Sequence, residues 1–226
     1  MRNTDVADVL RRAIRQGVLK PGEDLVQEEI AGRLGISRIP LREALRELAA
    51  VGVVQMSPGR GFRVTVLDAT EIAELYDLRL AIEPPLASRI VGYANRRQVD
   101  ELAAMEQQMR TAPDPERWAN LNYDFHLAMY ETAGVRHTLR LIGQLLDLVE
   151  PYSRLYVHEL HNLERVESEH AGMIEALRAG DGAALSELIT RHLSGARQGL
   201  VAAMTEQADG DVPDPIHRLI GLGERT

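Results

Sequence analysis

The sequence contains no cysteine, a single lysine, few aromatic residues and no long apolar run. Without cysteine the protein can form neither a disulfide nor a thiolate metal site. No apolar stretch approaches the ~20 residues that a membrane-spanning helix needs. The polar first eight residues also lack the apolar segment of a signal peptide. We therefore expect a cytoplasmic protein that does not enter a membrane.

The net charge of −8 is distributed unevenly along the 226 residues. Residues 1–66 contain 11 Arg or Lys and 8 Asp or Glu, whereas residues 67–226 contain 15 and 26. Basic character is therefore concentrated in the first third of the chain, where it favours contact with nucleic acid. Lys20 is the only lysine, so nearly all positive charge is on guanidinium groups, which pair bidentately with phosphate and guanine.

Residues 26–46 predict two short helices joined by a tight turn. Gly35 supplies the turn, because glycine takes a positive φ at little cost. Ser37 is expected to cap the second helix by accepting a hydrogen bond from a free backbone N–H. Pro40 falls in the first turn of that helix, where no intrahelical donor is lost. An apolar stripe at helical spacing follows, formed by Leu41, Ala44, Leu45 and Leu48.

Arg38, Arg42 and Arg46 recur at intervals of four on another face of this second helix. A short helix with a buried stripe and an arginine row suits the DNA major groove, where arginine binds guanine edges or phosphates. The alternative is a solvated face on which the arginines pair with Glu43 and Glu47.

Residues 53–66 predict a β-hairpin, with strands at 53–56 and 62–66 and a turn at 57–61. Arg60 lies between two glycines at its tip, where a basic side chain can reach a phosphate or the minor groove. The alternative is a tight hairpin with no further role. A helix-turn-helix followed by a basic hairpin is more specific for DNA binding than either part.

These motifs extend over residues 5–66 and include Gly17–Leu25, Glu29–Ala31, Leu34–Arg46, Gly52 and Gly59–Gly61. Together they resemble the winged helix of GntR-type transcriptional regulators. In that family the residues equivalent to Ser37, Arg38 and Arg42 contact operator DNA, and the resemblance implies the same roles here. With Arg46 and Arg60 added from the residue pattern, these are the predicted DNA-binding residues.

From residue 70 onward the pattern predicts helices only. We expect a first helix at about 5–16, before the helix-turn-helix, and later ones at 70–86, 97–111, 116–133, 137–158, 162–179 and 181–204. Thr70 is the expected cap of the 70–86 helix, residues 68–70 are the expected hinge, and Pro84-Pro85 predicts a kink or break. Short connectors indicate an antiparallel bundle.

The predicted protein is thus mostly α. A winged helix-turn-helix domain of three helices and a small β-hairpin wing spans residues 1–67. An antiparallel all-α bundle spans 68–207, and a flexible tail spans 208–226.

Three of the seven histidines lie on three different predicted helices: His126, His170 and His192. Asn122 precedes His126 by four residues, so both side chains point the same way. Converging N and O donors would suit a divalent transition metal. The alternative is three unrelated histidines, each satisfied by solvent or a hydrogen bond. Glu169 is expected to lie off their face.

Phe125-His126, Glu169-His170 with Ile174–Asp181, and His192-Leu193 resemble the motifs of the FCD effector domain of FadR-type regulators, over about residues 70–205. The resemblance implies that the three histidines bind zinc or a similar ion, with nickel or manganese as alternatives. Asn122 would be the fourth ligand in place of the commoner aspartate, and a neutral amide oxygen is a weaker ligand than a carboxylate for a hard cation.

Arg79 matches an arginine that often faces the effector cavity of that domain. An arginine beside a bound cation forms an anion site, in which a metabolite carboxylate can bridge the two. The alternative is a pair on the helix surface between Arg79 and Glu83.

These inferences predict a metabolite-responsive transcriptional regulator that binds a palindromic operator as a homodimer and represses transcription. The proposed effector is a small organic acid. One alternative is a metal-dependent hydrolase, because three histidines and a weak fourth ligand leave a position for activated water; no general base is marked near them. Another is a constitutive DNA-binding protein with a structural metal.

Overall fold

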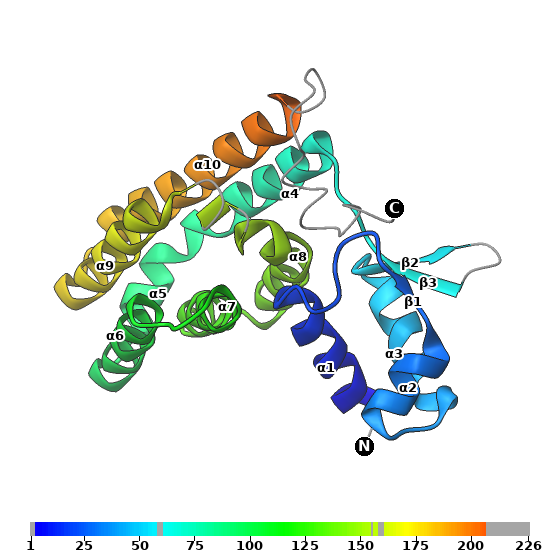
Figure 1. Ribbon diagram of the computed structural model, residues 1–226. Coiled ribbons are helices and arrows are strands. Elements are labelled where there is room, and N and C mark those ends of the chain that lie inside the picture. The colour runs from blue at the N-terminus through cyan, green and yellow to red at the C-terminus, as the bar shows by residue number, and fades with distance from the viewer. Residues whose placement is uncertain (1–2, 58–60, 155, 158–160, 207–226) are drawn as a thin grey trace. The chain divides into compact units, whose positions relative to one another are not determined.

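The computed structural model describes residues 3–57, 61–154, 156–157 and 161–206 (Figure 1). The chain divides between Leu67 and Asp68 into two compact units. The predicted wing-tip residue Arg60 and the predicted tail at 208–226 lie outside the described residues. No described helix is long and apolar enough to cross a membrane.

The N-terminal unit is a winged helix-turn-helix. Its helices are α1 (Asn3–Arg15), α2 (Gln27–Leu34) and α3 (Arg38–Ala50), and its strands are β1 (Asp24–Leu25), β2 (Val54–Ser57) and β3 (Gly61–Val64). The strands pair antiparallel in the order β1-β3-β2. Strand β1 was not predicted, because two residues are too few to show an alternating pattern. The predicted apolar stripe of α3 is completely buried and packs against α1.

The turn between α2 and α3 confirms one prediction and corrects another. Gly35 ends α2 with a left-handed φ of 64°. Ser37 occupies the N-cap position of α3, but its side chain makes no capping hydrogen bond. A capping side chain bonds the N–H of the second or third helical residue, and the third residue here is Pro40, which has no N–H. The proline therefore removes one of the two donors that Ser37 needs.

The C-terminal unit is all-helical. It contains α4 (Ala69–Ile82), the short 3₁₀ turn η1 (Pro84–Leu86), α5 (Ala87–Tyr93), α6 (Arg96–Arg110), α7 (Pro115–Glu131), α8 (Arg136–Arg154), α9 (Leu163–Ala179) and α10 (Gly182–Glu206). The long α10 packs against both α4 and α9 (Figure 1). The break predicted at Pro84-Pro85 is confirmed, because α4 ends at Ile82. The separate helix α5 after it was not predicted.

The start of α4 differs from the prediction. Asp68, not Thr70, is the N-cap, and it forms a reciprocal capping box with Glu71. The Glu71 N–H donates to Asp68 Oδ1 at 2.8 Å, and the Asp68 N–H donates to Glu71 Oε2 at 2.9 Å. An acidic residue three positions after the cap satisfies two free donors at once. Residues 68–70, the predicted hinge, are therefore the N-cap and the first two residues of α4, at the boundary between the two units.

Candidate DNA-binding face and metal site

The arginine row of α3 lies on the exposed face opposite the buried stripe. Arg38, Arg42 and Arg46 line one surface groove of ≈ 250 Å³, together with Gln27, Ile39 and Glu43. Within the described part of the chain, no hydrogen bond or ion pair engages the three guanidinium groups. Glu47, one of the acidic partners considered above, pairs instead with Arg11 of α1 at 2.7 Å. The groove thus presents free guanidinium groups to a ligand.

The three predicted histidines lie together in the C-terminal unit, although they come from different helices. His126 lies on α7, His170 on α9 and His192 on α10. One nitrogen from each ring lies within 4.8 Å of the others. The ring centroids are 5.1 Å apart for His126–His170 and His126–His192, and 5.0 Å apart for His170–His192. Three imidazoles in a near-equilateral triangle can close on one ion with small side-chain shifts.

Buried polar atoms around this triangle fit a metal. Among the described residues, nothing hydrogen-bonds to Asn122 Oδ1, His126 Nδ1 or His170 Nε2, although all three atoms are buried. A buried polar atom without a partner costs about 1–3 kcal/mol. Burial first, and the neighbouring histidines next, hold the pKa of His126 and of His170 well below 6.5. Both rings are therefore neutral at neutral pH, the form that binds metals.

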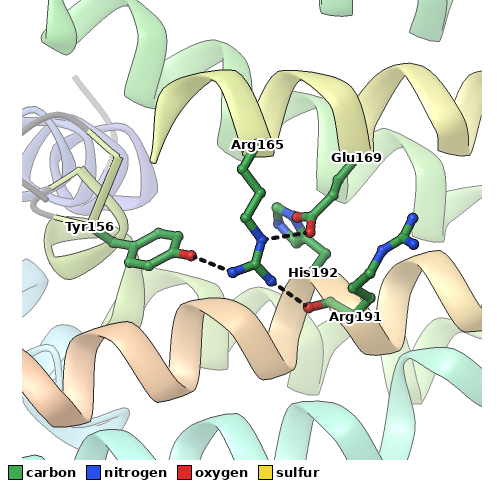
Figure 2. Close-up of polar contacts among 5 residues, drawn as sticks. All are labelled: Tyr156, Arg165, Glu169, Arg191 and His192. Carbon is green, nitrogen blue, oxygen red and sulfur yellow. Dashed lines mark hydrogen bonds and ion pairs between the residues drawn. The ribbon is translucent and has the colours of Figure 1, made fainter. Parts of the chain in front are cut away.

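A buried carboxylate orients the third histidine. His192 Nδ1 lies 3.0 Å from Glu169 Oε2 (Figure 2), which leaves Nε2 of His192 for a metal. Burial raises the pKa of Glu169, but hydrogen bonds and charge from His192 and Arg165 outweigh it, and the net pKa is lowered. The expectation that Glu169 lies off the histidine face was wrong. It contacts His192 across the α9–α10 packing, and such a carboxylate fixes the tautomer and orientation of a metal-binding ring.

A second carboxyl group lies beside Asn122. The amide nitrogen of Asn122 donates to Glu150 Oε1 on α8 at 2.9 Å. The amide oxygen is thereby left as the donor that can face a metal. Sequence reasoning missed Glu150, because the contact joins residues 28 positions apart and no spacing rule relates them.

Arg79 combines features of both earlier interpretations. It pairs with Glu83 four residues on, with Nε 2.6 Å from Oε1, but the pair is buried and not on the surface. Tyr130 donates to the other Glu83 oxygen at 2.6 Å. Burial opposes the charge of Arg79, yet Glu83 more than compensates, so the pKa of Arg79 is raised. Arg79 also lines a cavity together with Asn122, His126, Glu150 and His192.

Acidification should destabilise the helical unit. Because the pKa of His126 and of His170 is lowered by burial, the unfolded chain binds more protons than the folded chain below pH 6.5. The free energy of unfolding should therefore fall with decreasing pH, by about 1.4 kcal/mol per unit for each ring. Urea titrations in EDTA at pH 7.5 and 5.5 measure this slope. Replacing both rings with glutamine should flatten it, whereas replacing the exposed His137 should not.

Both units match known protein families. The family "Bacterial regulatory proteins, gntR family" matches residues 2–64, and the FCD domain matches residues 74–195. The chain is 26% identical to the HTH-type transcriptional repressor RspR of Escherichia coli over 92% of each protein. It is 28% identical to a probable D-xylose utilization operon transcriptional repressor of Paenarthrobacter nicotinovorans, over 84% of this chain and 85% of the relative.

Solved structures show the same fold. Escherichia coli McbR/YncC superposes with a TM-score of 0.79 at 24% identity, over 92% of this chain and 98% of the other. A GntR regulator from Rhodococcus sp. RHA1 gives a TM-score of 0.76 at 23% identity, over 89% and 98%. The family consists of transcription regulators and not enzymes, so the hydrolase alternative is set aside. The chain belongs to the GntR family of bacterial regulatory proteins and is a DNA-binding transcriptional regulator with a C-terminal FCD domain.

Proposed function

We propose that this regulator represses transcription from a palindromic operator as a homodimer, and that a small carboxylate bound beside a metal ion changes its operator affinity. The observation that carries the proposal is the cluster of His126, His170 and His192. Two of these histidines, His126 and His192, line a cavity together with Asn122 and Arg79. Repression is supported by relatives that are named repressors. A dimer is supported by the modest basic charge of one winged helix, since two copies double the contacts. An operator on the chromosome would place the protein in the cytoplasm.

The DNA contacts would come from Ser37, Arg38, Arg42 and Arg46, with Arg60 at the wing. The Ser37 hydroxyl makes no capping bond, so it can bind a phosphate. Ile39 is 71% exposed between the arginines, and such an apolar side chain suits the methyl group of thymine.

Replacing Arg42 with alanine should weaken operator binding by about 1–3 kcal/mol and relax base preference at one position. The reason is that a guanidinium on the exposed face of α3 can read a guanine edge. Binding of the parent and the variant to an operator selected from random DNA measures the change, and Arg38→Ala is expected to behave alike. The exposed Arg97 of α6 provides the control, because Arg97→Ala should bind as the parent does. If both α3 variants bind the operator as tightly as the parent does, the assignment of α3 as the DNA-reading helix is wrong.

The metal would be held by His126, His170 and His192, with Asn122 as the fourth donor. Neutral imidazoles suit zinc, and nickel is compatible with the same donors. Manganese prefers oxygen ligands, so this donor set favours it least. When bound, the ion would supply a positive charge to the cavity wall.

The cavity favours a small ligand that carries one carboxylate. Its free volume is ≈ 20 Å³, enough for about one water, so a larger ligand must displace side chains. Glu83 already neutralises Arg79, and the carboxyl group of Glu150 lines the same space. The cavity therefore already contains one carboxyl group, and a second carboxylate on the ligand would meet the acidic side chain of Glu150.

Operator binding in the presence of zinc, of EDTA and of a panel of small carboxylates tests the proposal. We expect one monocarboxylate to change affinity about 10-fold, which corresponds to ~1.4 kcal/mol of coupling, and to lose its effect in EDTA. A carboxylate that acts equally well without metal would contradict its placement beside the ion. Operator affinity that no carboxylate changes would favour the constitutive alternative.

A further inference from the structure

A continuous set of contacts connects the cavity wall to His192. Tyr156, which lies in a short π-helical stretch after α8, lines the cavity, and its hydroxyl lies 3.3 Å from Arg165 Nη1. Arg165 Nε donates to Glu169 Oε1 at 3.0 Å, and the other oxygen of Glu169 contacts His192 (Figure 2). The remaining Arg165 nitrogen, Nη2, donates to the carbonyl of Arg191 on α10 at 3.4 Å. One guanidinium thus contacts Tyr156, the Glu169 carboxylate and the backbone of α10.

The surface of α10 has space for this arrangement because of two glycines. A Cβ at Gly195 would overlap the Arg165 guanidinium and lie 2.7 Å from Nη1. A Cβ at Gly199 would overlap the Tyr156 ring and lie 2.9 Å from Cδ2. Gly195 and Gly199 follow His192 by three and seven residues, so all three lie on one helix face. Glycine inside a helix costs about 0.5–1 kcal/mol relative to alanine, and what is gained here is room for the two side chains.

We propose that Arg165 is a positioning residue of the metal site: it holds the Glu169 carboxylate that orients His192 and joins it to Tyr156 in the cavity wall. This inference rests on the proposed metal site. Glu169 is 6% exposed and Arg165 44% exposed, so the guanidinium shields the outer side of the carboxylate while the histidine occupies the inner side. Arginine suits this place because its planar fork serves three acceptors at once, whereas a lysine ammonium is a single point of charge.

The arrangement also couples the cavity to the metal. A ligand that displaces Tyr156 would withdraw one partner from Arg165, and the same guanidinium sets the position of Glu169. Ligand and metal should therefore influence each other's binding through Arg165, and by the reciprocity of linkage each affects the other equally.

Zinc affinity, measured by competition with a chromophoric chelator, tests the role of Arg165. Loss of an outer partner of a metal-binding histidine lowers metal affinity by about 10–100-fold, and we expect about 10-fold for Arg165→Ala. Arg165→Lys keeps the charge beside Glu169 and should recover most of this loss. The visible spectrum of the Co²⁺ form should also change in Arg165→Ala, because His192 is reoriented. A purely structural role for Arg165 would leave that spectrum unaltered.

Glycine variants provide a second test that leaves every polar group in place. Gly195→Ala should lower zinc affinity as Arg165→Ala does, because the methyl group displaces the guanidinium. When Arg165→Ala is already present, Gly195→Ala should cause no further loss of zinc affinity. Comparison of the two single variants with the double variant is a double-mutant cycle. Gly143→Ala in α8 is the matched control, since a Cβ there meets no atom within 4 Å, and it should bind zinc as the parent does.

The possible failures are distinguishable. If Arg165→Ala and Gly195→Ala keep the parental zinc affinity while His170→Ala loses it, the role of Arg165 is wrong and the metal site stands. If Gly195→Ala costs the same factor with and without Arg165, the glycine acts by another route and the inference is likewise overturned. If the parent binds no zinc, the proposed metal site itself fails.

Discussion

Replacing Arg79 with alanine should lower the free energy of unfolding by about 3–5 kcal/mol. Glu83 has no exposed surface, and among the described side chains it would keep only the hydrogen bond from Tyr130. Breaking a buried ion pair from one side leaves an uncompensated charge, which is far more costly than losing the pair as a whole. Chemical unfolding of the metal-free protein measures the change.

Two comparisons separate this effect from a general loss of an arginine. Glu83→Gln in the Arg79→Ala background should recover much of the stability, because the buried charge is removed. Arg97→Ala breaks a pair with Glu101 at the same i, i+4 spacing, but that pair is exposed and its loss should be undetectable. A change in Arg79→Ala no larger than in Arg97→Ala would show that the buried pair contributes nothing. Because of this cost, Arg79→Lys is the better variant for testing effector binding.

Zinc should stabilise the helical unit, and His170→Ala should abolish this stabilisation. A ligand that binds only the folded state at 1,000 times its Kd adds about 4.1 kcal/mol to the free energy of unfolding. For a unit of this size the midpoint of thermal unfolding should rise by roughly 10 °C. Removing one of three imidazoles leaves too few donors for a tight site. His126→Ala and His192→Ala should behave alike.

Replacement of the exposed His137 is the control, and it should leave the zinc effect unchanged. Calorimetry of the parent with and without zinc measures the shift, and elemental analysis gives the metal content. If His170→Ala is stabilised by zinc as strongly as the parent, the ion binds elsewhere. Asn122→Asp should bind zinc more tightly than the parent, since a carboxylate adds charge to the donor set.

Local patterns predicted the parts of the fold that depend on local physics. The apolar stripe of α3 and the turn at Gly35 are confirmed, because periodicity and positive φ are properties of neighbouring residues. The break at Pro84-Pro85 is confirmed for the same reason. The cap at Asp68 could have been found from Glu71 three residues later, which is the recognised spacing of a capping box.

The site was predictable only in part. Motif resemblance selected the three histidines, and helical spacing related Asn122 to His126. Glu150 was missed and Glu169 was misplaced, because these carboxylates contact partners on other helices, 28 and 23 residues away. On its own helix each has the pattern of an ordinary acidic residue. Such contacts depend on how α7, α8, α9 and α10 pack together, which no local spacing encodes.

Helix α4 connects the capping box at Asp68 to the cavity at Arg79, so a tilt of the helix at one end displaces the other end. Arg79, at the cavity, lies eleven residues beyond Asp68, about 16 Å along a helix axis. The box with Glu71 satisfies two free N–H groups at the start of the helix, and Leu67 just before it is buried. A tilt of about 10° at the cavity end would therefore displace the Asp68 end by about 3 Å. Asp68 is also the first residue of the C-terminal unit, so the displacement would be largest at the boundary between the two units.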